Sequence, residues 1–288
     1  MLEVDGVPRS ALEALVQASY HHAQQNPDAV AYGHPLDHDI YAGARWVSEP
    51  LRLYDCSREN DGAAAVLLTS AERARDLRPV PAYVLSGVRG AGPDWSESAE
   101  NSAAYTSAGF HLALVARPWA EAGLKPGETD VVQVYENFSG PAVASLIDLG
   151  LCPPGADAGS FMTLPNLIAP AGTLPVNTAG GNLAEGFVHG IGLVLEAVRQ
   201  IRGTPANQVP GADISLLLGG PVAPLVSATV FGSAATLRPP RFAGTAEAED
   251  HAGEDGEGGE ELKRRDLRRA ATAVDGHQRS PTIMMTAA

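Results

Sequence analysis

The stretch that decides the fold reads Leu174-Pro175-Val176-Asn177-Thr178-Ala179-Gly180-Gly181-Asn182-Leu183-Ala184-Glu185-Gly186-Phe187-Val188-His189-Gly190. Gly180 and Gly181 can adopt positive φ angles, which suits a tight turn and lets a ligand approach the backbone closely. The turn does not resemble a P-loop, because no Lys-Ser/Thr pair follows the glycines. A helix is expected to begin at Ala184 or Glu185 and to end at Arg202. The stretch therefore predicts a glycine turn that feeds a helix.

Strands and helices alternate on both sides of this stretch. The predicted helices cover residues 10–25, 70–75, 97–122 and 140–149, and Asn60-Asp61-Gly62 forms a turn. The predicted strands cover residues 63–68, 82–87, 131–135, 214–220 and 227–232. This alternation predicts an α/β fold, with a layered sheet and helices packed on both of its faces.

The charge of the chain argues against two classes of partner. Its 288 residues carry a formal net charge of -14 at pH 7. Proteins that follow nucleic-acid phosphates or dock on anionic membranes gain affinity from clustered Lys and Arg. We therefore expect no nucleic-acid partner and no membrane partner.

Cysteine usage indicates a cytoplasmic protein. Cys56 and Cys152 lie far apart without metal-ligand spacing, and residues 1–8 look like the inside of a domain rather than a signal peptide. No apolar run is long enough to span a bilayer. We expect reduced, inert thiols and no bound metal. Two histidine pairs lack the flanking ligands of a metal site and are interpreted as exposed polar residues: His21 with His22, and His34 with His38.

The composition changes near the C-terminus, over residues 239–288. Residues 247–261 are nearly all Glu, Asp, Gly and Ala, and a basic cluster covers 263–269. Such a segment buries too little apolar surface to offset the entropy lost on ordering. The sequence therefore predicts a disordered, solvated tail.

Four separate stretches, in order and at matching spacing, resemble the thiolase superfamily in its sterol-carrier, lipid-transfer branch. They are Asp55-Cys56 with residues 61–74, residues 130–138, residues 177–190 and residues 196–203. The resemblance covers about residues 1–235. It implies a thiolase-like layered fold (αβαβα), with an incomplete first half over 1–92, a complete second half over 93–238 and a homodimer. It also implies that the part bearing the acylated cysteine nucleophile is missing from the first half.

The resemblance also implies where chemistry takes place. Tyr135 follows a predicted strand at a position where thiolases have Asn or His, and a lipid-transfer subgroup that cleaves steroid side-chain acyl-CoAs has tyrosine there. A phenol, with a pKa near 10, donates a proton or, once activated, accepts one. The alternative is a core aromatic residue with a satisfied hydroxyl group.

The second motif departs from the family pattern. Phe187 stands where thiolases have the histidine of their Gly-His-Pro motif and where the aldolase subgroup is expected to have a second tyrosine. Phe187 transfers no proton. His189 is a catalytic candidate, although residues two apart on a helix point to nearly opposite sides. A structural histidine that holds the loop is the equally weighted alternative.

These observations predict a retro-aldol enzyme that cleaves a carbon–carbon bond in acyl-CoA thioesters, in steroid or lipid side-chain degradation. Tyr135 and His189 are the predicted catalytic residues. Gly180, Gly181 and Phe187 are predicted to bind substrate, with loop amides polarising the thioester oxygen. We expect no tightly bound cofactor, coenzyme A as part of the substrate, and a small partner with an oligonucleotide-binding-like fold. The alternative is a truncated or non-catalytic acyl-CoA-binding subunit related to acetyl-CoA acetyltransferases.

Overall fold

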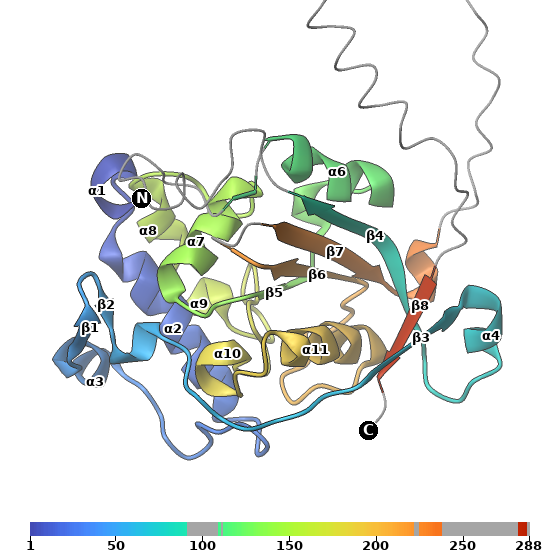
Figure 1. Ribbon diagram of the computed structural model, residues 1–288, viewed down its shortest axis with the longest axis horizontal. Helices are drawn as coiled ribbons and strands as arrows, with labels where there is room; N and C mark the ends of the chain where they lie inside the picture. The colour runs from blue at the N-terminus through green and yellow to red at the C-terminus, as the bar shows by residue number, and fades with distance from the viewer. Residues whose placement is uncertain (91–108, 111, 222–224, 238–281, 287–288) are drawn as a thin grey trace, which may run out of the picture. The chain divides into compact units, whose positions relative to one another are not determined.

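The computed structural model describes residues 1–90, 109–110, 112–221, 225–237 and 282–286 (Figure 1). They belong to one compact unit, Met1–Leu237 with the last residues of the chain. Its centre is a six-stranded sheet in the order β3-β8-β4-β7-β6-β5. The strands are β3 (Val66–Ser70), β4 (Ala82–Gly90), β5 (Val131–Val134), β6 (Ile214–Gly219), β7 (Val226–Gly232) and β8 (Thr282–Thr286). β5 and β6 pair in parallel, and the other neighbouring strands pair antiparallel.

Helices cover both faces of the sheet, as the sequence predicts (Figure 1). Alternate side chains of a strand point to opposite faces. Leu216, Leu218 and Val230 pack in one core with α2 (Arg9–Ala23), α7 (Ser139–Asp148) and α6 (Leu112–Ala122). Leu217 and Phe231 point the other way and pack against α11 (Ile191–Arg202).

The shorter elements surround this framework. They are α1 (Leu2–Asp5), α3 (His38–Gly43), β1 (Trp46–Ser48), β2 (Leu51–Arg52), η1 (Leu53–Asp55), α4 (Ala71–Arg75), η2 (Pro126–Glu128), α8 (Asp157–Phe161), α9 (Leu164–Leu167), α10 (Gly181–Ala184) and η3 (Ala234–Thr236). β1 and β2 form a separate two-stranded sheet. No helix in the described ranges is both long enough and apolar enough to cross a membrane.

Most predicted elements are present, and one is corrected. α2, α7, β6 and β7 match their predicted ranges to within two residues. For the predicted helix 97–122, the structure describes α6, whereas residues 97–108 and 111 lie outside the described residues. The single helix predicted from Ala184 or Glu185 to Arg202 is wrong. α10 ends at Ala184 and α11 begins at Ile191, because His189 and Gly190 have φ angles of 48° and 79°, outside the helical region.

The two predicted halves share one sheet in the described residues, because β4 pairs with β7. The predicted boundary at residues 92 and 93 lies outside the described residues. The predicted disordered tail is wrong for residues 282–286, which form β8 between β3 and β4. These residues, Thr-Ile-Met-Met-Thr, include two β-branched threonines and an isoleucine, which favour strands. The rest of residues 239–288 lies outside the described residues.

The buried carboxylate of Asp55 fixes the segment before β3 to the helical layer. Its oxygens accept hydrogen bonds from the Tyr41 hydroxyl at 2.9 Å, the Ser139 hydroxyl at 2.7 Å and the Arg52 amide at 2.7 Å. The Arg9 guanidinium lies 3.4 Å away and balances the charge. Buried charges need such partners, so Asp55 anchors this segment beside the start of α7.

One histidine of the predicted exposed pairs is buried. His22 lies on the inner face of α2, and its Nε2 accepts a hydrogen bond from the Ala169 amide at 2.9 Å. Burial lowers the pKa of His22 to about 3, so the ring is neutral. The prediction that His22 is exposed was wrong. The sequence of α2 alone does not show that the Ala169 amide, which lies in a distant loop, donates a hydrogen bond to this side chain.

Candidate active site

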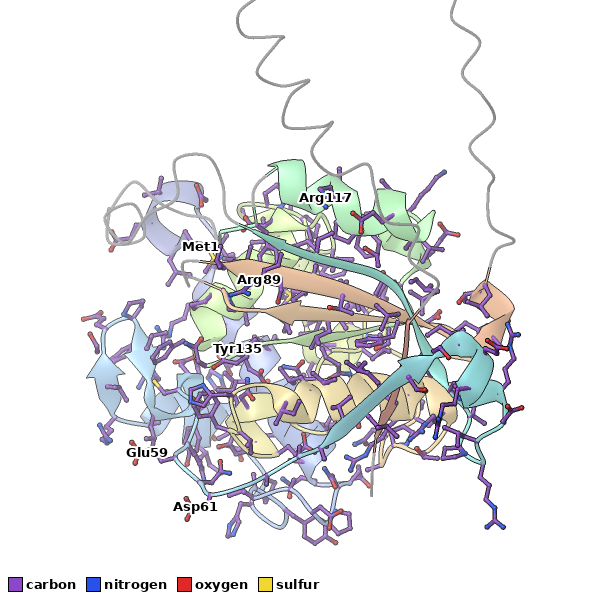
Figure 2. All side chains as sticks on the ribbon, turned by 45° about the vertical axis from the view of Figure 1, so that its right-hand side comes forward. Met1, Glu59, Asp61, Arg89, Arg117 and Tyr135 are labelled. Atoms are coloured by element: carbon purple, nitrogen blue, oxygen red, sulfur yellow. The ribbon has the colours of Figure 1, made fainter. Side chains whose placement is uncertain are left out.

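Tyr135 lies directly after β5, at the carboxyl end of this strand (Figure 2). Its amide donates to the Leu218 carbonyl at 2.9 Å, so the backbone at Tyr135 continues the β5–β6 pairing. The side chain is partly exposed and lines a cavity of about 510 Å³. The alternative of a fully packed core aromatic residue therefore does not describe Tyr135.

Asn177 fastens the glycine loop to β5. β5 is the last strand of the sheet, and its free side is taken by residues 175–177. The Asn177 side chain accepts a hydrogen bond from the Val134 amide at 2.8 Å and donates to the Val134 carbonyl at 3.0 Å. Asn177 has a φ angle of 52°, in the left-handed region that Asn tolerates better than most residues. The loop thus starts at a fixed point next to Tyr135.

Gly180 and Gly181 lie inside the protein. Both residues are buried. Neither lines the 510 Å³ cavity beside Tyr135 or the second cavity, near Phe187, that is described below. The Gly180 amide already donates to the Asn177 carbonyl at 2.9 Å. A Cβ atom on Gly181 would lie 1.7 Å from Oε1 of Glu136. Both glycines are needed because the protein's own atoms approach them closely. Their substrate-binding role stays a prediction.

The turn between α10 and α11 brings the other candidates together. The Phe187 ring lies 6.1 Å from the Tyr135 ring and 5.0 Å from the His189 ring, measured between centroids. Because this turn is not helical, Phe187 and His189 face each other despite being two residues apart. Tyr135 and His189 both line the 510 Å³ cavity, together with residues of α11, β6 and β7. The structure thus assembles three of the five predicted site residues.

A second, more polar cavity lies on the other side of this turn. It has a volume of about 430 Å³ and is lined by Glu59, Asn60, Asp61, Phe187 and His189. His189 borders both cavities. Figure 2 shows Glu59 and Asp61 on the extended segment that precedes β3. This segment therefore contributes to the site although it is remote from Phe187 in sequence.

The surroundings of Tyr135 favour the protonated phenol. Burial, and secondarily the neighbouring Glu136 carboxyl group, raise the pKa of Tyr135. Glu136 is itself fully buried, with its carboxyl group near the amides of Asn182 and Leu183, and burial raises its pKa well above the ordinary value. A phenol with a raised pKa is a proton donor at neutral pH.

A buried polar network supports the loop from behind. The Thr178 hydroxyl donates to Oε1 of Glu196 at 2.5 Å and accepts from the Gln133 and Gln200 amides at 3.1 and 2.9 Å. Burial raises the pKa of Glu196 to about 7. Burial, and then the charge of Glu196, raise the pKa of the nearby Glu185 to about 8. The network connects β5, the loop and α11.

The raised pKa of Glu196 makes stability depend on pH. Its carboxyl group, ordinarily near 4.5, stabilises the fold fully below that pH and loses this contribution as pH rises through about 7. We expect Glu196→Gln, which keeps the acceptor oxygen, to stabilise the fold by roughly 2–3 kcal/mol at pH 8 and by much less at pH 5. The measurement is the free energy of unfolding in urea, for the parent and for Glu196→Gln, between pH 5 and pH 8. An unchanged pH profile in the variant would remove Glu196 as the cause.

Gly190 allows the Tyr135 ring to lie against the backbone. A Cβ atom there would lie 2.6 Å from Cδ2 of Tyr135, and φ is 79°. Gly33 has the same φ of 79° with open space around it, so Gly33→Ala is a matched control. We expect Gly33→Ala to cost about 1 kcal/mol and Gly190→Ala at least about 1 kcal/mol more. Equal losses in denaturant unfolding would show that the ring does not need this space.

Neither cysteine of the chain is an activated thiol. Cys152 is buried and burial raises its pKa to about 12. Burial, and then the charge of Asp55, raise the pKa of Cys56. Thiolate is the nucleophilic form, so this result agrees with the prediction of inert thiols. In the described part of the chain, no cluster of three or more metal-ligating side chains is present.

Comparison with known proteins identifies the family. Residues 95–231 match the family described as "Thiolase C-terminal domain-like". The chain is 35% identical over 229 residues to the 17-hydroxy-3-oxo-4-pregnene-20-carboxyl-CoA lyase of Mycobacterium tuberculosis, covering 76% of this chain and 56% of the lyase. The chain belongs to the thiolase superfamily. The resemblance inferred from the four sequence stretches is thereby confirmed.

Two further similar proteins support the same family assignment for this thiolase-like chain. A steroid side-chain-cleaving aldolase of Thermomonospora curvata is 36% identical over 198 residues, covering 68% of this chain and 50% of the aldolase. The solved structure titled "Ltp2-ChsH2(DUF35) aldolase" has a TM-score of 0.72 at 29% identity, covering 81% of this chain and 60% of that chain. The chain thus spans about half to three fifths of the length of these relatives.

Three residues of this site were not singled out from the sequence. Asn177 lies in the loop motif, but its pairing with Val134 depends on which strand lies at the edge of the sheet. Glu136 follows Tyr135 directly, and its burial under Gly181 is a tertiary contact. Asn60 was predicted only as part of a turn. The signal that could have identified Asn177 is an Asn directly before small residues at the start of a glycine loop.

Proposed function

We propose that this chain acts in retro-aldol cleavage of an acyl-CoA thioester that carries a β-hydroxyl group. The observation that carries the proposal is a tyrosine and a histidine on the wall of one cavity. The chain that carries them is related to a 17-hydroxy-3-oxo-4-pregnene-20-carboxyl-CoA lyase and to a steroid side-chain-cleaving aldolase. A steroid or a similarly bulky side-chain thioester is the substrate class proposed, with coenzyme A as part of the substrate and no tightly bound cofactor.

In this proposal the two side chains divide the proton transfers. The imidazole of His189 accepts the proton of the β-hydroxyl group. The bond between the α- and β-carbons breaks, and the electron pair of this bond forms the enolate of the thioester. The β-carbon, when its hydroxyl group is tertiary, becomes a ketone. Tyr135 donates its phenolic proton to this enolate, which becomes the released acyl-CoA. His189 then returns a proton to Tyr135 through solvent, so that the cycle is balanced.

Phe187 does not carry a proton in this proposal. Its ring lies against both the Tyr135 ring and the His189 ring. We assign it the role of an apolar contact for the acyl group and a spacer that sets the orientation of both rings. A second tyrosine at this position, as the sequence comparison with the aldolase subgroup implied, is not needed if His189 accepts the proton.

A small partner protein completes the proposal. The solved structure most relevant here is a complex whose title names a DUF35 component. We propose that this chain also works with a partner of that type, and that it forms a homodimer. The alternative, an acyl-CoA-binding subunit without activity, is favoured by one observation, the phenylalanine at position 187.

The test is turnover by the purified chain, alone and co-expressed with a DUF35-type partner from the same source. Acyl-CoA thioesters with a tertiary β-hydroxyl group and a bulky side chain are supplied, and the ketone and the shortened acyl-CoA are measured together. Formation of both products in equal amounts supports the proposal. Thiolysis of a 3-ketoacyl-CoA to two acyl-CoA products, or binding without turnover in both preparations, contradicts it.

A further inference from the structure

The turn before β3 contacts the turn that carries Phe187 and His189. Oδ1 of Asn60 accepts a hydrogen bond from the Phe187 amide at 2.6 Å, across 127 residues of sequence. A Cβ atom on Gly62 would lie 2.7 Å from Cγ2 of Val188, so the two turns pack closely around this bond. Phe187 is therefore held at its backbone as well as through its ring.

The same segment also contacts the end of the β5 motif. The Ser57 amide donates to the Asn137 carbonyl at 2.9 Å, and Cys56 forms an isolated bridge with Phe138. Residues 56–62 thus touch both parts of the candidate site, the residues after Tyr135 and the turn around Phe187. Asp55, at the start of this segment, is fixed by its buried hydrogen bonds.

We propose that Asn60 is a positioning residue, which sets the place of the Phe187–His189 turn relative to Tyr135. Residues 185–190 belong to no helix or strand, His189 is exposed, and the Phe187 amide bonds to Asn60 rather than within the turn. One side-chain oxygen on a segment that also binds the Tyr135 motif fixes the distance between the two reacting groups. The effect on turnover rests on the proposed function, whereas the effect on the turn itself does not.

Three variants separate positioning from general stability. Asn60→Ala removes the acceptor, and Asn60→Asp retains an oxygen that accepts from the Phe187 amide. Asp37→Ala is the matched control, because Oδ1 of Asp37 accepts from the Ile40 amide at 2.8 Å in an exposed turn away from both cavities.

The first measurement is amide hydrogen exchange of a peptide that covers residues 186–189, which requires no activity. We expect exchange in Asn60→Ala on the order of tenfold faster than in the parent, with Asn60→Asp close to the parent and Asp37→Ala unchanged in this peptide. Equal exchange in Asn60→Ala and the parent would overturn the proposal, whether or not the chain is an enzyme.

The second measurement is steady-state turnover with the partner present. Small misplacements of reacting groups reduce the rate strongly. We expect Asn60→Ala to lower kcat by about ten- to a hundredfold with KM changed by less than about threefold, and Asn60→Asp to restore most of it. If Asn60→Ala has the same kcat as the parent although amide exchange in its turn is faster, the positioning role is overturned. If the parent itself has no turnover, the proposed function fails while the exchange result still decides the structural inference.

Discussion

Tyr135→Phe is expected to lower kcat by a factor of roughly a hundred to ten thousand. The change removes one oxygen and retains the ring, so the ring contacts with Phe187 and the space at Gly190 are preserved. The raised pKa keeps the phenol protonated, and a phenylalanine has no proton to donate to the enolate. Steady-state turnover with the partner present is the measurement.

The control for this variant is Tyr32→Phe, at an exposed tyrosine outside both cavities. Both variants are expected to change the free energy of unfolding by no more than about 1 kcal/mol. A loss of turnover in Tyr135→Phe with unchanged stability supports proton transfer by the phenol. Turnover equal to that of the parent would remove Tyr135 from the mechanism.

Asn177→Ala is expected to destabilise the fold by about 3 kcal/mol. It leaves the buried Val134 amide and carbonyl without their side-chain partners, and each costs about 1–3 kcal/mol. Alanine is also less suited than asparagine to the φ angle of 52°. Asn177→Gly relieves the backbone but not the unpaired groups, so it should recover only about 1 kcal/mol of the loss. Denaturant unfolding measures all three proteins.

The control for Asn177 is Asn166→Ala, where the side chain donates to the Phe161 carbonyl at 2.8 Å and accepts from the exposed Thr173 hydroxyl at 3.3 Å. This control is expected to cost about 1 kcal/mol. If Asn177→Ala costs no more than Asn166→Ala, the asparagine does not fasten the loop to β5.

The sequence predicts the framework well because its signals are local. The apolar runs of β5 and β6 and the glycines that end α7 and α11 lie within the elements they define. β8 escaped prediction because five strand-forming residues follow a long charged segment. Local signals thus suffice for most of the sheet and its helices, but not for a short strand that stands alone after a charged segment.

Only part of the candidate site was predicted, again because only local sequence signals can be recognised. Tyr135 and His189 were found from motifs within the chain, and the structure places them on one cavity. Gly180 and Gly181 were predicted as backbone that is approached closely, and the structure shows this for the protein's own atoms: the Glu185 amide lies against Gly180 and the Glu136 carboxyl group against Gly181. Asn60 could not be found, since its partner amide lies 127 residues away.

The most direct test of the account is the product analysis of one reaction. An acyl-CoA with a tertiary β-hydroxyl group and a bulky side chain is incubated with the chain and its DUF35-type partner in deuterated water, and both products are identified by mass spectrometry. Retro-aldol cleavage predicts a ketone and a shortened acyl-CoA in equal amounts, with one solvent deuteron at the α-carbon of the acyl-CoA. The absence of a ketone, or cleavage that requires free coenzyme A as acceptor, would contradict it.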